Sequence, residues 1–360
     1  IASAPGDESM HDRQFFLRDL EAGRRLDLML VAAVTSVLVI RFYLDVTGYP
    51  KIGGESLHIA HMLWGGLLMV AALVLATSFL GRGPGQWAAF LGGLGFGTFI
   101  DEIGKLLTHD NDYFYEPAVS LIYVAMVLLY LAGRSLHRER VATRADYLAN
   151  AMVEMLEVPR GDLDPHEQKR ALNYLDRAGD GAVALHLRAV FREAPLVPVT
   201  QPSRAQRLVQ RLVNAYRRIA ATAWFGRLLI ALFAAGVLVD ILRLFALARL
   251  LPEAGETLLR VPLISALPLD TSHYTLTQWL QMGSTFLAGI FAAAGIFWVF
   301  RDRLMALRMF QRSIFVSLFL TQVFIFYRVQ WYGLIALAVN LMTLAALRFM
   351  IEEERPLIAG

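Results

Sequence analysis

The hydrophobic positions of the chain fall in long, nearly uninterrupted runs, separated by stretches in which charged residues gather. A run of about 20 apolar residues can cross the roughly 30 Å hydrocarbon core of a bilayer as a helix. Such runs lie at 26–45, 58–80, 86–107, 117–133, 223–247, 276–300, 310–328 and 331–350. The pattern therefore predicts an all-α integral membrane protein with about eight transmembrane helices.

The arginines at the ends of these runs predict the orientation. They concentrate before the first and fifth runs and after the fourth and sixth. Because cytoplasmic loops carry an excess of Arg and Lys, an even number of spans with both termini cytoplasmic satisfies every cluster. The loops at 46–57, 108–116 and 249–275 then face outward, and we expect the protein in the cytoplasmic (inner) membrane of a bacterium. No cleavable signal peptide is visible, so the first apolar segment is expected to direct insertion.

A polar stretch, 134–220, separates the two sets of spans and reads as a small cytoplasmic helical insert. Within it, Asp164 is suited to cap a helix that starts at Pro165 and has Glu167 in its first turn. The predicted domains are a cytoplasmic N-terminal segment 1–25, a first membrane repeat 26–133, the insert and linker 134–220, a second membrane repeat 221–350 and a cytoplasmic tail 351–360.

The second set of four spans resembles the first, which predicts an internal duplication into two parallel four-helix repeats. The matched segments begin at Arg25 and Arg227, at Ser56 and Thr271, and at Phe99 and Phe319. In the third match, Asp101 and Glu102 are replaced by Thr321 and Gln322, which keep much of the shape and lose the charge. Charge-dependent chemistry is therefore expected in the first half.

Acids and histidines gather at the predicted outer ends of the first three spans. The spacing i, i+3, i+6 places Glu55, His58 and His61 on roughly one helical face. Asp101 and Glu102 lie near the outer end of the third span. The same patch includes Arg41, Asp45, Lys105, His109 and Asp112, with His273 at the matching place in the second half.

Imidazole and carboxylate groups together suit a divalent metal ion such as Zn²⁺, Mn²⁺ or Fe²⁺. The candidate ligands are Glu55, His58, His61, Glu102 and His109. Asp101 or Asp112 would then act as a general base in a catalytic site. Haem between two histidines is a weaker alternative, because these histidines lie near the surface. In a purely structural alternative, Asp101 and Glu102 pair with Arg41 and Lys105.

Glycines are concentrated in the third predicted span and recur in the second. They lie at 92, 93, 95 and 97, and at 65 and 66. Small residues let membrane helices approach closely. We therefore expect close packing between the second and third helices.

Composition narrows the function classes. The chain is 56% hydrophobic and 18% charged, with a mean hydropathy of +0.49, which excludes a disordered or ordinary soluble protein. Its 34 basic residues against 31 acidic ones give a net charge of +3 without a basic stripe, so nucleic acid is not an expected partner. The absence of cysteine removes disulfides and thiolate chemistry.

The segment from Gly92 to Pro117, G-G-L-G-F-G-T-F-I-D-E-I-G-K-L-L-T-H-D-N-D-Y-F-Y-E-P, resembles one found in bacterial multi-pass membrane proteins. The resemblance covers under a tenth of the chain. It implies the same broad fold class and carries no activity or ligand with it.

Three functions fit these features. The first is cation- or proton-linked transport or conduction through the bilayer, using the outward patch. The second is a metal-dependent membrane enzyme acting on a lipid or other substrate at the outer face. The third is a non-catalytic subunit whose insert docks a protein partner. The residues do not decide between enzyme and transporter, and they leave a homo-oligomer open.

Overall fold

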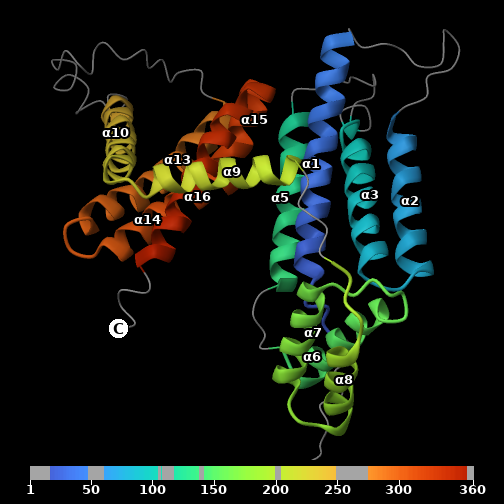
Figure 1. The fold of residues 1–360 in the computed structure, drawn as a ribbon. Helices are drawn as coiled ribbons and strands as arrows, with labels where there is room; N and C mark the ends of the chain where they lie inside the picture. The colour runs from blue at the N-terminus through green and yellow to red at the C-terminus, as the bar shows by residue number, and fades with distance from the viewer. Residues whose placement is uncertain are drawn as a thin grey trace, which may run out of the picture. The chain divides into compact units, whose positions relative to one another are not determined.

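The computed structural model describes residues 17–47, 61–103, 107, 117–137, 142–198, 204–248 and 275–354. Every regular element in these ranges is a helix, as Figure 1 shows, and no strand occurs among them. The predicted all-α class is confirmed. The chain divides into two compact units, which we call unit 1 (Ile1–Glu102 with Leu128–Gln201) and unit 2 (Ile103–Val127 with Pro202–Gly360).

Long apolar helices make up much of the described chain. Six segments within it are long and apolar enough to cross a membrane: Ala22–Thr47, His61–Ser78, Ala118–Ser135, Trp224–Ile241, Leu276–Trp298 and Arg303–Glu354. Helix α3 (Arg82–Ile100), which is rich in glycine, is not among them. A membrane protein is thus plausible from its apolar helices, and the total of eight spans stays a prediction.

In unit 1, helices α1 (Ala22–Thr47) and α2 (His61–Ser78) both pack against α3. A Cβ added to Gly65 of α2 would lie 2.7 Å from the carbonyl oxygen of Gly95 of α3, so these helices touch backbone to backbone. Gly93 and Gly97 face α1 instead, and an added Cβ there would overlap the α1 backbone. The predicted contact between the second and third helices is confirmed, and the contact with α1 is an addition to it.

Residues 142–198 of the polar insert form a small helical subdomain of unit 1, whereas residues 204–220 belong to unit 2. Its elements are α6 (Arg144–Glu154), η1 (Met155–Glu157), α7 (Pro165–Ala178) and α8 (Ala182–Glu193). Leu163, Leu175 and Phe191 are completely buried between them. The predicted helix start is confirmed, because the Asp164 carboxylate accepts hydrogen bonds from the backbone N–H groups of the first turn, including that of Glu167.

Unit 2 contains the remaining helices. They are α9 (Arg204–Ala220), α10 (Ala223–Ala248), α13 (Leu276–Trp298), α14 (Arg303–Val316), the π-helical turn η2 (Ser317–Thr321), α15 (Gln322–Val329), η3 (Gln330–Tyr332) and α16 (Gly333–Glu354). The chain reverses at Gln330, whose φ is +46°, so that α16 packs back against α14 and α15. Phe310 is buried at the centre of this core and stacks on Phe233 of α10 with ring centroids 4.4 Å apart.

Helix α5 (Ala118–His137) contributes its first residues to unit 2 and the rest to unit 1. Its N-terminal part is buried in unit 2, where the Tyr123 hydroxyl donates a hydrogen bond to the Leu318 carbonyl oxygen at 2.6 Å. This contact ties α5 to the π-helical turn.

Candidate functional site

Two buried acids follow the last turn of α3. Asp101 is completely buried and Glu102 is 2% exposed. Asp101 continues the helical hydrogen bonding, since its N–H donates to the Gly97 carbonyl oxygen at 3.1 Å. Acids at the C-terminal end of a helix oppose its dipole, so their charges require partners from elsewhere.

Arg41 of α1 is the partner of Asp101. Its Nε donates to Asp101 Oδ1 at 2.6 Å, and a terminal guanidinium nitrogen donates to the Asp101 carbonyl oxygen at 2.9 Å. The planar guanidinium therefore holds both the side chain and the backbone of Asp101, a geometry that a lysine cannot reproduce. The pairing of Arg41 with Asp101, which the structural alternative predicted, is present.

His61, the first residue of α2, lies between the two acids. Its Nε2 is 3.2 Å from Asp101 Oδ2, and its Nδ1 is 3.6 Å from Glu102 Oε1. The next backbone N–H, of Met62, donates to Glu102 Oε2 at 2.8 Å. The Glu102 carboxylate thus accepts a hydrogen bond from one of the N–H groups that have no helical partner in the first turn of α2.

We call these four side chains, Arg41, His61, Asp101 and Glu102, the acid–imidazole cluster. Its members come from three helices and are brought together because α3 packs against both α1 and α2. The two nitrogens of the imidazole face two different carboxylates. That arrangement suits proton transfer, because an imidazole can accept a proton at one nitrogen and release one from the other.

A metal site places a stricter demand on geometry. The ligand atoms of a metal site must converge on one point about 2 Å from each of them. Here the two His61 nitrogens face two different acids, Nε2 toward Asp101 and Nδ1 toward Glu102. Among the described residues no group of three His, Asp or Glu side chains is arranged to hold a metal ion. The metal prediction depends on ligands beyond this part of the chain.

Of the other predicted site residues, Asp45 is exposed, and the rest lie outside the ranges that the structure describes. Asp45 lies one turn beyond Arg41 on α1 and is exposed to solvent. The predicted residues Glu55, His58, Lys105, His109, Asp112 and His273 lie outside the described residues. The described ranges therefore bring together Arg41, His61, Asp101 and Glu102, and they leave Asp45 at the surface.

Polar contact continues along the α1–α3 interface below the cluster. The hydroxyls of Ser36 and Thr98 lie 2.9 Å apart, and both are buried. Each hydroxyl oxygen also lies within hydrogen-bonding distance of the Leu94 carbonyl oxygen, at 3.1 and 2.8 Å. Sequence reasoning missed this pair, although Thr98 stands one helical turn before Asp101.

A second ionic cluster surrounds Arg82 at the start of α3. Its guanidinium contacts Glu21 at 2.7 Å and Glu154 at 3.2 Å, and Arg170 of α7 contacts Glu154 at 2.8 Å. Burial, with a further contribution from neighbouring acids, raises the pKa of Glu154 to about 7 despite the opposing effect of Arg82. An arginine in the first turn of a helix opposes the helix dipole, which is a signal that sequence reasoning did not use.

The residues before α1 are fixed to the insert by hydrogen bonds. The Arg18 N–H donates to the Asp146 carboxylate at 2.9 Å, and the Leu20 N–H donates to the Asn150 side-chain oxygen at 2.9 Å. Burial acts to raise the pKa of Asp146, but the hydrogen bonds from Arg18 and Thr143 lower it below its ordinary value. The second ionic cluster and these bonds join the insert to α3 and to the residues just before α1.

Thr321 and Gln322, the predicted counterparts of Asp101 and Glu102, are also buried. Thr321 donates to the Ser284 hydroxyl at 3.0 Å, and the Gln322 amide donates to the Gly333 carbonyl oxygen at 2.8 Å. These positions in unit 2 therefore hold neutral hydrogen bonds instead of charges.

Comparisons with protein family models, curated proteins and solved structures found no match.

Proposed function

We propose that the protein is a membrane transport or conduction protein that binds and passes on a proton or other cation at the acid–imidazole cluster. The observation that carries the proposal is His61 lying between the buried carboxylates of Asp101 and Glu102. The structure of the cluster favours a proton over a larger cation, because the imidazole already occupies the space between the acids.

The energetic argument rests on the cost of buried charge. Ionisable groups in membrane helices are expensive and most often mark ion or proton pathways. Among the described side chains, the cluster has two acids and one guanidinium, and Arg41 bonds directly to Asp101. His61 lies between the two acids, where it can pass a proton from one carboxylate to the other.

The Ser36–Thr98 pair supports a path that continues inward. Hydroxyl groups donate and accept hydrogen bonds, so they can extend a proton-conducting chain. Both lie between α1 and α3, the same two helices that hold Arg41 and Asp101.

The proposal includes the finer topology predicted from the sequence: eight spans in two parallel repeats, both termini cytoplasmic, in a bacterial inner membrane. The hairpin of Arg303–Glu354 supports two spans there, because α16 returns along α14. The burial of Thr321 and Gln322 at the places matched to Asp101 and Glu102 supports the duplication.

The test is proton flux in liposomes containing the purified full-length chain, with a pH-sensitive dye inside and an imposed membrane potential. We expect flux in the wild type and at least a tenfold loss in Glu102→Gln and His61→Gln. Glu193→Gln is the matched control, because Glu193 is an exposed acid of α8. Wild-type liposomes without flux, or cluster variants that conduct as well as Glu193→Gln, would contradict the proposal.

The metal-dependent enzyme is the second candidate, and the proximity of His61 to Glu102 is the observation that favours it. Metal analysis of the same preparations separates the two. Stoichiometric Zn, Mn or Fe that is lost in His61→Gln would favour the enzyme, whereas metal-free protein with flux would favour transport.

A further inference from the structure

Unit 2 contains a cavity of about 440 Å³ where four helices end. It lies between the start of α10, the end of α13, the start of α14 and the end of α16, next to the turn that joins α9 to α10. The volume falls within the range of small-molecule sites.

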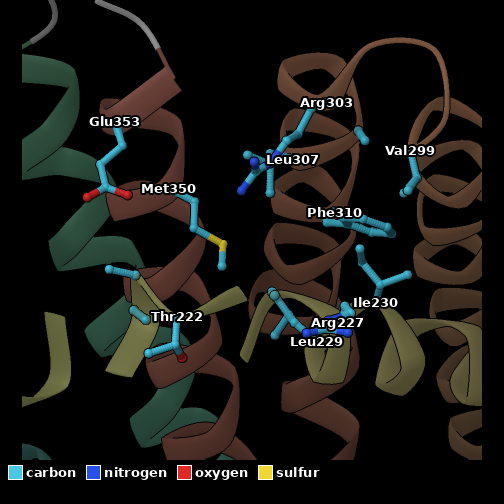
Figure 2. Close-up of a pocket in the computed structure, with 14 residues that line it drawn as sticks. Thr222, Arg227, Leu229, Ile230, Val299, Arg303, Leu307, Phe310, Met350 and Glu353 are labelled. Atoms are coloured by element: carbon cyan, nitrogen blue, oxygen red, sulfur yellow. The ribbon is translucent and has the colours of Figure 1, made fainter. Parts of the chain in front are cut away.

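The floor of this cavity is apolar. Figure 2 shows Met350 of α16 on one side and Leu307 and Phe310 of α14 on the other. These three side chains and Leu229 are almost fully buried. Such a floor accepts hydrocarbon and offers no hydrogen bonds.

Charged side chains from three helices surround the mouth. Arg227 belongs to α10, Arg303 to α14 and Glu353 to α16, and all three line the cavity and are exposed (Figure 2). Arg303 also contacts Glu354, with Nε and Oε1 3.1 Å apart. The mouth therefore presents both guanidinium and carboxylate groups above an apolar floor.

The helix termini around the cavity are rich in arginine, as expected of the cytoplasmic side of a membrane. These arginines include 217, 218 and 301. Helix α9 has the pattern of a helix that lies in the membrane interface: arginines 207, 211 and 218 share one face, and exposed Leu208, Leu212 and Ile219 share the other. Ala220, the last residue of α9, lines the cavity, so the cavity lies beside the end of this amphipathic helix.

We propose that this cavity binds a phospholipid with an amine headgroup, phosphatidylethanolamine in chemical class. The phosphate lies against Arg227 and Arg303, the ammonium group lies against Glu353, and the start of the acyl chains covers the apolar floor. Charge complementarity favours this occupant. Arginines suit phosphate oxygens, while the acids at the mouth disfavour a headgroup that carries only negative charge.

The test is native mass spectrometry of the full-length chain, delipidated in detergent and then mixed with one lipid at a time. The probes are dioleoyl phosphatidylethanolamine, dioleoyl phosphatidylcholine and dioleoyl phosphatidylglycerol, with inorganic phosphate as the competitor. We expect one equivalent of the ethanolamine lipid, retained about tenfold better than the choline lipid, and no displacement by phosphate.

Variants assign the binding to the cavity. Arg227→Gln with Arg303→Gln is expected to lower retention at least tenfold, and Glu353→Gln to abolish the preference for ethanolamine over choline. Arg308→Gln, an exposed α14 arginine that does not line the cavity, is the control and should bind as the wild type does. The three rim residues are exposed, so these changes should leave the thermal unfolding temperature unchanged, which is measured alongside.

Three outcomes would overturn the proposal. Equal retention of all three lipids would show no headgroup recognition. Displacement by inorganic phosphate would identify a phosphate site instead of a lipid site. Full binding by the double arginine variant would place the lipid elsewhere.

Discussion

The two ends of α3 hold buried charges of opposite sign, and they are satisfied in different ways. Arg82 at the start is held by Glu21 and Glu154, and Asp101 after the end is held by Arg41 and His61. Both signs oppose the helix dipole, which favours acids at the N-terminus and bases at the C-terminus. Neither charge is therefore stabilised by the dipole of α3, and each is stabilised by its ion-pair partners.

The difference between the ends lies in the kind of partner. The partners of Arg82 lie before α1 and in the insert, so that end joins the insert to α3 and the start of α1. The partners of Asp101 include an imidazole that also faces Glu102. That end therefore holds an imidazole between two carboxylates, whereas the Arg82 end pairs its carboxylates with guanidinium groups.

The largest expected effect comes from separating α1 from α3, which removes partners at both ends. Gly97→Leu places a side chain against the α1 backbone and should destabilise the protein by about 3 kcal/mol. The measurement is thermal unfolding of the full-length chain in detergent. Gly66→Leu is the control, since a Cβ at Gly66 meets no atom within 4 Å. Equal destabilisation by both variants would contradict the role of this contact.

A smaller effect is expected at the acid–imidazole cluster alone. Asp101→Leu leaves the Arg41 guanidinium, whose side chain is 11% exposed, without its carboxylate and should cost about 3 kcal/mol or less. Combining it with Arg41→Met should restore most of the stability, because the buried charges are then both gone. Proton flux should remain absent in the double variant. A double variant as unstable as the sum of the single ones would show that the pair is not coupled.

The smallest expected effect is the pH dependence of stability that arises from Glu154, at the Arg82 end of α3. The pKa of Glu154, about 7 in the folded protein, lies above its ordinary value of 4.5, so the folded state binds this proton more tightly than the unfolded state. The Glu154 contribution to stability is therefore greatest at low pH and is lost as pH rises through about 7, a change on the order of 1 kcal/mol. Unfolding temperatures measured from pH 5 to 8 should show this slope, and Glu154→Gln should flatten it. The exposed Glu193→Gln should keep the wild-type slope.

Much of the fold was predictable because its signals are local. The apolar run at 276–300 corresponds to α13, Leu276–Trp298, and that at 223–247 to α10, Ala223–Ala248. The helix start at Asp164 rests on residues within one turn of each other. Periodicity, capping and segment length depend on residues close together in the sequence, so they can be recognised without knowledge of the tertiary fold.

The candidate site was predictable only in part. Arg41, His61, Asp101 and Glu102 were all expected in one patch, and the structure brings these four together. The orientation of the His61 ring and the cluster around Arg82 were not foreseen. His61 and Arg82 contact residues 40 or more positions away in the sequence, and spacing along the chain does not determine which side chains meet across helices.

The sequence by itself determined an all-helical chain with long apolar segments, because the length and period of hydrophobic runs depend on local backbone geometry. The tertiary structure alone decided which charges are buried together. Gly93 and Gly97 let α1 approach α3 closely enough for Arg41 to reach Asp101. That approach sets the distances between acid, imidazole and guanidinium, and those distances decide whether the buried charges are tolerated.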